Sequence, residues 1–128
     1  MNKKRILIID DDVPLTLSMK INLEDIGDYE VRVENSSLKA VAAAREFRPD
    51  LILLDIVMPD LDGGDVSAQM KSDPMLADVP ILMVTALVSN SETGSDDVVS
   101  SGDQLMVAKP IKFDKLVHAI ESRLAGEL

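Results

Sequence analysis

The sequence predicts an α/β fold in which five parallel strands alternate with helices. Short, continuous aliphatic runs recur along the 128 residues, and longer segments with helical spacing separate them. Continuous Val, Ile and Leu runs are typical of strands buried on both faces of a sheet. Strands that alternate with helices require parallel crossovers, which place helices on both faces of that sheet. We therefore expect a doubly wound (βα)5 domain.

Four aliphatic runs are clear strand candidates, and a fifth run is weaker. Each clear run is followed by a residue that metal or phosphate chemistry can use, namely Asp10, Asp55, Thr85 or Lys109. The four runs are residues 5–9, 51–54, 81–84 and 105–108. The weaker run, residues 29–33, is expected to form an edge strand.

Helical spacing of apolar residues marks the segments between the strands. The first helix should stop at Gly27, and the second should end before Pro49, because the residue before a proline disfavours helix. The second is entered through residues 35–37, whose side-chain oxygens offer caps. The apolar positions expected on four helices are, in order, Leu17, Ile21, Leu23 and Ile26; Leu38, Val41, Ala42 and Phe47; Val66 and Met70; and Phe113, Leu116, Val117, Ile120 and Leu124.

The segment 89–103 breaks this pattern. It should hold the fourth helix, yet it consists largely of Ser, Asn, Asp and Gly, with only Val98 and Val99 apolar. Ser, Asn and Asp compete with the backbone for hydrogen bonds and are poor helix formers. We expect a short or frayed helix here.

Composition argues against several classes of protein. A net charge of −10 disfavours a free-standing nucleic-acid binder and suits cation binding. No apolar stretch approaches the 18 or so residues of a membrane span, and the apolar run near the start is too short for a signal peptide. The chain has no cysteine, so disulfides and thiolate metal sites are excluded. A cytoplasmic protein fits best.

The strand ends predict a shared site for a divalent cation and a phosphoryl group. Ligands of open parallel sheets bind beyond the carboxyl ends of the strands, so Asp10, Asp11, Asp55, Thr85 and Lys109 are expected to converge. Mg²⁺ prefers oxygen ligands and keeps several waters, so one or two carboxylates and a carbonyl suffice. A carboxylate can then attack phosphorus in line to give an acyl phosphate. Lysine and threonine would contact the phosphoryl oxygens.

This ordered set of motifs resembles the receiver domain of two-component response regulators, the CheY-like superfamily, over essentially the whole chain. The matching pieces are the acid pair after the first strand, Asp55 followed by Pro59 and Gly63, Thr85-Ala86, and Lys109-Pro110. The resemblance implies a flavodoxin-like fold with strand order 2-1-3-4-5. It also implies a signalling module, not an enzyme in the usual sense, that receives its phosphoryl group from a histidine kinase or a histidine phosphotransfer protein.

The resemblance assigns roles by position around the phosphoacceptor, which would be Asp55. Asp10 and Asp11 match the acid pair that binds Mg²⁺ or Mn²⁺, with Asp11 as the principal ligand. Asp55 and the backbone carbonyl of Val57 would complete the protein's share of the metal ligands. Slow self-dephosphorylation is expected, because Val57 and Leu87 occupy positions that position or block the attacking water in receivers and neither can orient it.

The remaining assignments concern the phosphoryl group and the switch. Thr85, Ala86 and Lys109 match the phosphoryl-binding positions, and the bond before Pro110 is expected to be cis. Met106 stands where receivers commonly carry Tyr or Phe, and the stretch from the threonine to the lysine is longer than usual. Both departures fall on the face made by the fourth helix, the fifth strand and the last helix, through which receivers signal.

One alternative function stays open, and the residues disfavour two others. A phosphorylation-independent interaction module that keeps the fold and has lost the switch is the main alternative. A flavodoxin would need a Ser/Thr/Gly-rich loop after the first strand, and a haloacid-dehalogenase-like phosphatase would need Asp-x-Asp where residues 55–57 read Asp-Ile-Val. Asp12 is expected to cap the first helix, and His118 to be solvated.

The expected organisation is a single receiver domain over residues 1–128. The sequence ends a few residues after the last helix, so no output domain is expected in this chain. It would be a stand-alone receiver or a fragment of a longer protein, and a monomer or weak dimer. No direct nucleic-acid or membrane partner is expected, and the sequence does not identify the output protein.

Overall fold

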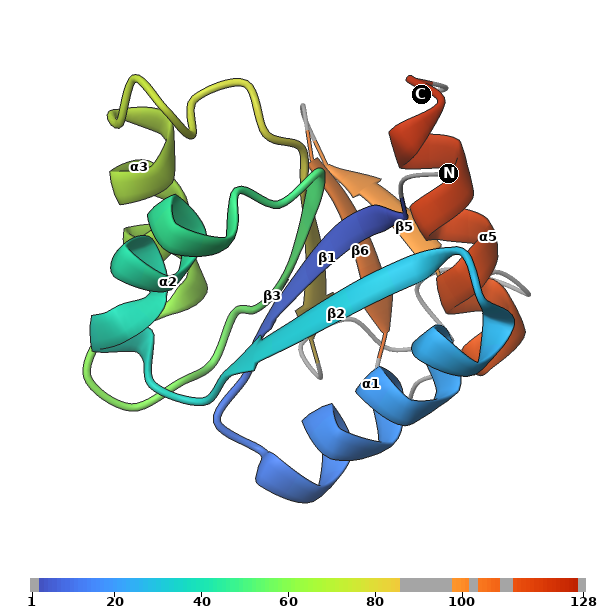
Figure 1. The fold of residues 1–128 in the computed structure, drawn as a ribbon. Coiled ribbons are helices and arrows are strands. Elements are labelled where there is room, and N and C mark those ends of the chain that lie inside the picture. Colours follow the sequence, from blue (N-terminus) through green and yellow to red (C-terminus); the bar gives the residue numbers. More distant parts are fainter. Residues whose placement is uncertain (1–2, 86–97, 102–103, 109–111, 127–128) are drawn as a thin grey trace.

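The computed structural model describes residues 3–85, 98–101, 104–108 and 112–126, which form alternating strands and helices (Figure 1). The elements in chain order are β1 (Lys4–Ile9), α1 (Val13–Ile26), β2 (Tyr29–Glu34), the 3₁₀ turn η1 (Ser37–Lys39), α2 (Ala40–Phe47), β3 (Leu51–Asp55), α3 (Gly63–Lys71), β4 (Ile81–Thr85), β5 (Val98–Ser101), β6 (Gln104–Ala108) and α5 (Phe113–Leu124).

The strands form a six-stranded sheet in the order β2-β1-β3-β4-β6-β5. All pairs are parallel except β5 with β6. The predicted parallel order is therefore confirmed along β2-β1-β3-β4, and β6, which coincides with the expected fifth strand, follows β4. The fold is the expected α/β arrangement with one added strand.

Part of the segment 89–103, in which a short or frayed helix is expected, forms a strand; residues 89–97, where that helix could still lie, are outside the described part of the chain. Val98 to Ser101 form β5, which runs antiparallel to β6 with Val98 opposite Val107 and Ser101 opposite Gln104. β-branched valines suit a pleated strand better than a helix, and a short antiparallel hairpin needs no crossover. The preceding residues, 86–97, lie outside the described part of the chain.

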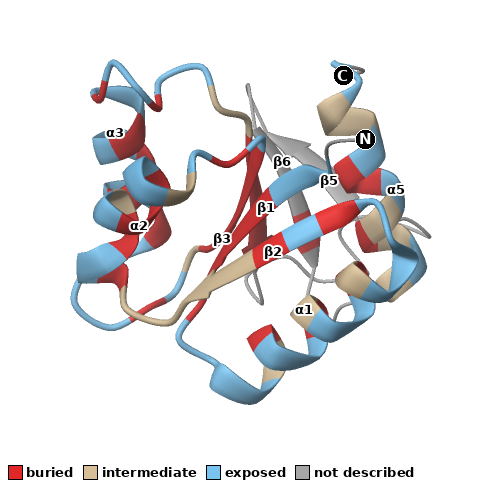
Figure 2. Ribbon diagram, in the orientation of Figure 1, coloured by how far each residue is buried: buried red, intermediate tan, exposed pale blue. Residues whose placement is uncertain are grey.

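Helices cover the two faces of the sheet, with α1 and α5 on one side and α2 and α3 on the other (Figure 1). Each face has its own apolar cluster, one built with Leu23 and Leu116, the other with Ala44 and Met70. β3 is buried along its whole length between them, as Figure 2 shows in red. No helix within the described residues combines the length and apolar composition needed to cross a bilayer.

The face that α1 buries differs from the expected one. Thr16, Met19 and Leu23 are buried, whereas Leu17 and Ile21 are exposed. Apolar residues lie on both sides of this helix, so spacing alone could not choose between them. Other expected features are confirmed, since α1 ends at Gly27 in a left-handed conformation and α2 ends before the proline.

The edge strand β2 is closed by side chains from α1. Lys20 Nζ donates a hydrogen bond to the Val31 carbonyl at 2.9 Å, and Glu24 Oε2 accepts one from the Val31 amide at 3.1 Å. The Val31 amide and then Lys20 hold the pKa of Glu24 below its usual value. Edge strands are often blunted in this way, because unpaired backbone groups invite other strands.

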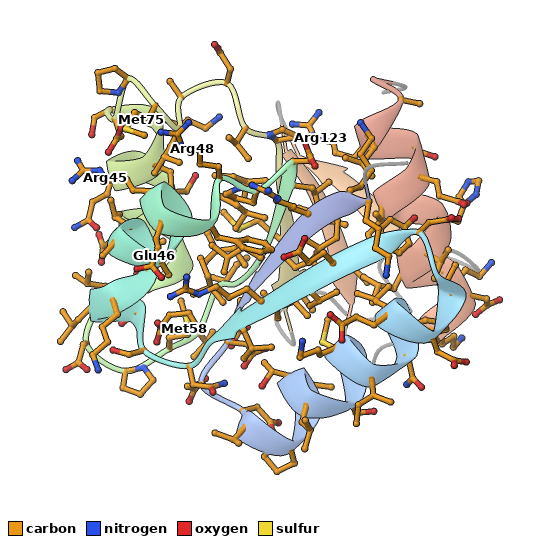
Figure 3. All side chains as sticks on the ribbon, viewed as in Figure 1. Arg45, Glu46, Arg48, Met58, Met75 and Arg123 are labelled. Carbon is orange, nitrogen blue, oxygen red and sulfur yellow. The ribbon has the colours of Figure 1, made fainter. Side chains whose placement is uncertain are left out.

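A buried carboxylate joins α2 to the loop after α3. Asp73 is buried, and its oxygens accept hydrogen bonds from the Met75 amide at 2.9 Å and from Arg45 Nε at 2.5 Å. Figure 3 places Arg45 and Met75 on the side of α2 and α3. The Met75 amide first, and the Arg45 guanidinium second, lower the pKa of Asp73 because both favour the ionised form.

We predict that Asp73→Asn lowers stability in a pH-dependent way. A lowered folded-state pKa stabilises the protein above the ordinary carboxyl pKa of about 4, and this contribution disappears as the pH falls through the folded value. Urea denaturation at several pH values should show the largest difference between wild type and variant near neutrality, shrinking in acid. A difference that grows below pH 4 would contradict this account.

Candidate metal and phosphoryl site

Two neighbouring strands bring three carboxylates together at one edge of the sheet. β1 and β3 pair in parallel with Ile9 opposite Leu54, so Asp10 and Asp55 come next on adjacent strands. One carboxylate oxygen from each of Asp10, Asp11 and Asp55 lies within 4.8 Å of the others. Sequence reasoning expected these three acids to converge, and the structure brings them together.

Burial distinguishes the three acids. Asp10 and Asp55 are only 3% and 4% exposed, whereas Asp11 is open to solvent. The Asp12 amide donates to Asp10 Oδ1 at 3.0 Å, and Asp12 itself caps α1 by accepting from the Leu15 amide at 3.1 Å. The expected capping role of Asp12 is therefore confirmed. Acidic side chains are seldom buried, so two buried acids beside an exposed one distinguish this edge of the sheet.

The cluster fits the oxygen-ligand chemistry of a small divalent cation. At Mg²⁺–oxygen distances of about 2.1 Å, opposite corners of an octahedron lie about 4.2 Å apart, close to the span of this cluster. The ligand atoms are all carboxylate oxygens, which suit Mg²⁺ or Mn²⁺ better than softer metals. One exposed and two buried acids leave an open side toward solvent, where a cation could keep waters or meet a substrate.

The loop after β3 is held against the backbone of Asp55 by a glycine. The Gly63 amide donates to the Ile56 carbonyl at 2.7 Å. A Cβ at Gly63 would lie 2.5 Å from the Asp55 carbonyl oxygen and 2.7 Å from the Ile56 Cα. Only glycine fits there, so Gly63 sets how closely α3 approaches the strand that carries Asp55.

Asp62 and Asp65 form a reciprocal capping box that starts α3 at this point. Asp62 Oδ1 accepts from the Asp65 amide at 2.9 Å, and Asp65 returns a longer contact to the Asp62 amide. Val57, in the same loop, is 58% exposed. The cap and the glycine contact together fix the loop that leads from Asp55 to α3.

Other predicted site residues are described only in part. Thr85 ends β4, whose register sets Asp55 opposite Val84, so its backbone lies at the same edge as the acids. Ala86, Leu87, Lys109 and Pro110 lie outside the described residues, as do the side chains of Thr85 and Met106. Their predicted roles and the predicted cis bond therefore stay predictions. His118 is exposed on α5, as expected.

Sequence reasoning missed two polar residues that reach the acid-bearing loops. Asn35 and Ser37 were expected to offer caps to the second helix, but their side chains bond to Asp10 and Pro59 instead. These partners are 25 and 22 residues away in sequence. No local pattern links residues so far apart, so the sequence carried no signal for these contacts.

We predict that the two adjacent glycines of α3 respond oppositely to substitution. Gly63→Ala should lower stability by about 1–3 kcal/mol, because its Cβ forces the loop off the β3 backbone. Gly64→Ala is the matched control, since its Cβ would meet only the Asp62 side chain, at 3.2 Å. It should be neutral or gain up to about 1 kcal/mol of stability. Urea denaturation measures both, and equal effects would refute the role given to Gly63.

Comparison with known proteins gives a consistent result. The family model described as response regulator receiver domain matches residues 6–121. The chain is 39% identical over 126 residues to the DNA-binding dual master transcriptional regulator RpaA of Synechocystis, covering 94% of this chain and 48% of RpaA. It therefore spans about half the length of that relative.

A second relative is matched along nearly its whole length. The polar-differentiation response regulator DivK of Brucella anthropi is 32% identical over 123 residues, covering 94% of this chain and 96% of DivK. The fold is similar to the crystal structure of a CheY-like response regulator receiver domain protein from Methanospirillum hungatei, with a TM-score of 0.79, 26% identity, and coverage of 98% and 96% of the two chains. The chain therefore belongs to the response regulator receiver domain family, whose members are phosphorelay signalling modules and not classical enzymes, and it carries an acidic pocket at Asp10, Asp11 and Asp55.

Proposed function

We propose that the protein accepts a phosphoryl group on Asp55 in a Mg²⁺-dependent reaction, from a histidine kinase or a histidine phosphotransfer protein. The observation that carries this proposal is the convergence of two buried acids and one exposed acid at the carboxyl ends of β1 and β3. Ligand sites of this fold class occur at that edge.

Topology favours Asp55 over its two neighbours as the phosphoacceptor. β3 lies between β1, which leads to Asp10 and Asp11, and β4, which ends at Thr85. A phosphoryl group on Asp55 would therefore have the acid pair on one side and a hydroxyl-bearing residue on the other. Asp10 is buried, and its Oδ1 accepts a hydrogen bond from the Asp12 amide, which fixes its carboxylate beside that of Asp55.

The transfer forms one bond and breaks one. A carboxylate oxygen of Asp55 attacks phosphorus, and the bond from phosphorus to the donor's imidazole nitrogen breaks in line. Asp10, Asp11, Asp55 and the Val57 carbonyl are the proposed ligands of Mg²⁺ or Mn²⁺, which would neutralise charge on the acids and the phosphoryl oxygens. Thr85, the Ala86 amide and Lys109 are the proposed contacts on the remaining oxygens.

The route from the site to an output partner is proposed to involve the segment after β4, β6 and α5. Met106 on β6 replaces the usual aromatic residue, and β5 occupies part of the segment expected to be helical. These two features also support the alternative, a phosphorylation-independent interaction module. We propose that residues 1–128 act as one receiver unit in the cytoplasm, where receiver domains typically act, as a monomer or weak dimer.

We predict that incubation with acetyl phosphate and Mg²⁺ adds a single phosphoryl group, at Asp55. Mass spectrometry of the intact protein and of its peptides measures this directly. Asp55→Asn should abolish the modification because the amide cannot attack phosphorus, and chelating the metal should do the same to the wild type. Persistent modification of Asp55→Asn would refute the assignment, and an unmodified wild type would favour the interaction module.

An exposed apolar row on α1 supports docking of the phosphodonor protein beside the acids. Val13, Leu17 and Ile21 recur every fourth residue and are 56%, 54% and 58% exposed. Residues at that spacing share one face of a helix, and this helix begins directly after the acid pair. An apolar row beside an acidic site suits contact with another protein, because large exposed apolar patches mark interaction surfaces.

We predict that Leu17→Asp slows transfer from a protein phosphodonor about fivefold or more, the loss expected for an interface residue worth 1 kcal/mol. Transfer from acetyl phosphate should be unchanged, because a small donor does not need the row. Met75→Asp is the matched control, since Met75 is equally exposed but lies beside Arg48 and Pro49 at the other end of β3 (Figure 3). Equal slowing with both donors would contradict a docking role.

We also predict slow loss of the phosphoryl group from Asp55. Val57 is exposed in the loop after β3 and has no side-chain group that can orient a water, and Leu87 has none either. Orientation of the attacking group can carry several kcal/mol of a barrier. Val57→Asn combined with Leu87→Gln should shorten the half-life of phosphorylated protein after donor removal. An unchanged half-life would show that other residues control the water.

A further inference from the structure

The connection between β2 and α2 reaches the loop that carries the acid pair. Asn35 Nδ2 donates to the Asp10 carbonyl at 2.8 Å and to Thr16 Oγ1 at 3.0 Å. Thr16 is buried in the first turns of α1, where its hydroxyl donates to the Val13 carbonyl at 3.0 Å. One side chain thus ties the end of β1 to the start of α1, on either side of Asp11.

The same connection also reaches the loop that follows Asp55. Ser37 is buried, and its Oγ donates to the Pro59 carbonyl at 2.8 Å and accepts from the Leu61 amide at 3.1 Å. These two bonds hold the loop between β3 and α3 at Pro59 and Leu61. Asn35 and Ser37 are only two residues apart, yet each holds a different half of the acid site.

The connection is itself anchored to the sheet. The Glu34 carbonyl accepts from the Asp10 amide at 3.2 Å, and Glu34 Oε2 accepts from the Ser36 amide at 3.0 Å. Capping does not explain this arrangement, because Ser36 precedes η1 without a side-chain cap bond. The side chains of Asn35 and Ser37, on either side of Ser36, bond instead to the loops after β1 and β3.

We propose that Asn35 and Ser37 are positioning residues that together set the spacing between the Asp10–Asp11 half and the Asp55–Val57 half of the cation site. This inference rests on the proposed cation binding at that site. Asp11 and Val57 lie beyond the ends of β1 and β3, so strand pairing alone does not fix them, and groups behind metal ligands commonly tune affinity by orienting those ligands. Short side chains suit the task because they lose little conformational freedom.

The experiment compares Asn35→Ala, Ser37→Ala and the double variant with the wild type. Mg²⁺ affinity is measured by calorimetry on the whole, unphosphorylated chain. Each single substitution removes two hydrogen bonds and should weaken binding about three- to tenfold, because only part of that loss reaches the cation site. Asn22→Ala and Ser72→Ala are matched controls, because their side chains bond only within α1 or at the end of α3 among the described residues. Both controls should bind Mg²⁺ as the wild type does.

The double variant tests whether the two residues act on one shared spacing. Once one substitution has loosened one half of the cation site, the second substitution has less Mg²⁺ affinity left to remove. The affinity loss of the double variant should therefore be smaller than the product of the two single losses. A product of the two effects would mean two independent local contacts and would overturn the shared role. Unchanged Mg²⁺ affinity in both single variants, or no Mg²⁺ binding by the wild type, would overturn the proposal altogether.

Kinetics separate positioning from general damage to the fold. At low Mg²⁺, Asn35→Ala and Ser37→Ala should be modified by acetyl phosphate more slowly than the wild type. At saturating Mg²⁺ their rates should equal that of the wild type, because the substitutions affect only cation affinity. A loss that persists at saturation would contradict the proposal. If the wild type binds Mg²⁺ but takes no phosphoryl group, the proposed phosphoacceptor fails while the calorimetry still decides the positioning role.

Hydrogen exchange tests the Ser37 contact directly, first in the unmutated protein and then in Ser37→Ala. The Leu61 amide, bonded to Ser37 Oγ, should exchange its hydrogen slowly in metal-free solution. Ser37→Ala should speed exchange at that amide and leave the amides of β1 unchanged. Fast exchange at Leu61 in the wild type would show that the brace does not form in solution.

Discussion

Mutual repulsion among three carboxylates is the constraint around which this molecule is arranged. One carboxylate oxygen from each lies within 4.8 Å of the others, and like charges at such distances disfavour one another unless a cation lies between them. The sheet imposes this proximity, because the register of β1 against β3 sets Asp10 and Asp55 side by side. The side chains of both strands pack into the two apolar clusters, which hold that register. Burial of those strands therefore supplies the free energy that keeps the acids together, and a cation or a phosphoryl group with its counter-ion would find a preformed site.

Bracing of the surrounding loops follows from the same constraint. Gly63 lets α3 approach the Asp55 backbone, and Asn35 and Ser37 bond to the loops on both sides. Repelling groups on unsupported loops would move apart, since loops are the parts of a fold that yield most easily. Among the described residues, Asp10, Asp11 and Asp55 form the one group of acids close enough to share a cation, and it lies at the carboxyl ends of β1 and β3.

Strands and site acids were predictable because burial leaves a clear mark on sequence. β3 is buried at every position, so it reads as an unbroken apolar run that ends where Asp55 begins. The buried face of α1 was not predictable, because Leu17 and Ile21 are as apolar as the residues that pack inside. β5 was missed because its valines sit among polar residues typical of loops. The contacts of Asn35 and Ser37 join residues that are far apart in the sequence, so no local sequence pattern could predict them.

Thermal unfolding of wild type and Asp11→Asn, with and without Mg²⁺, tests the central claim most directly. Asp11 is exposed, so its substitution removes charge without opening a cavity. Relief of repulsion worth about 1 kcal/mol should raise the metal-free melting temperature by about 3–6 °C, and the increase caused by Mg²⁺ should become smaller than in wild type. Asp25→Asn, on the far part of α1, should change neither quantity. An unchanged or lower metal-free melting temperature for Asp11→Asn, with the full Mg²⁺ effect retained, would contradict the account.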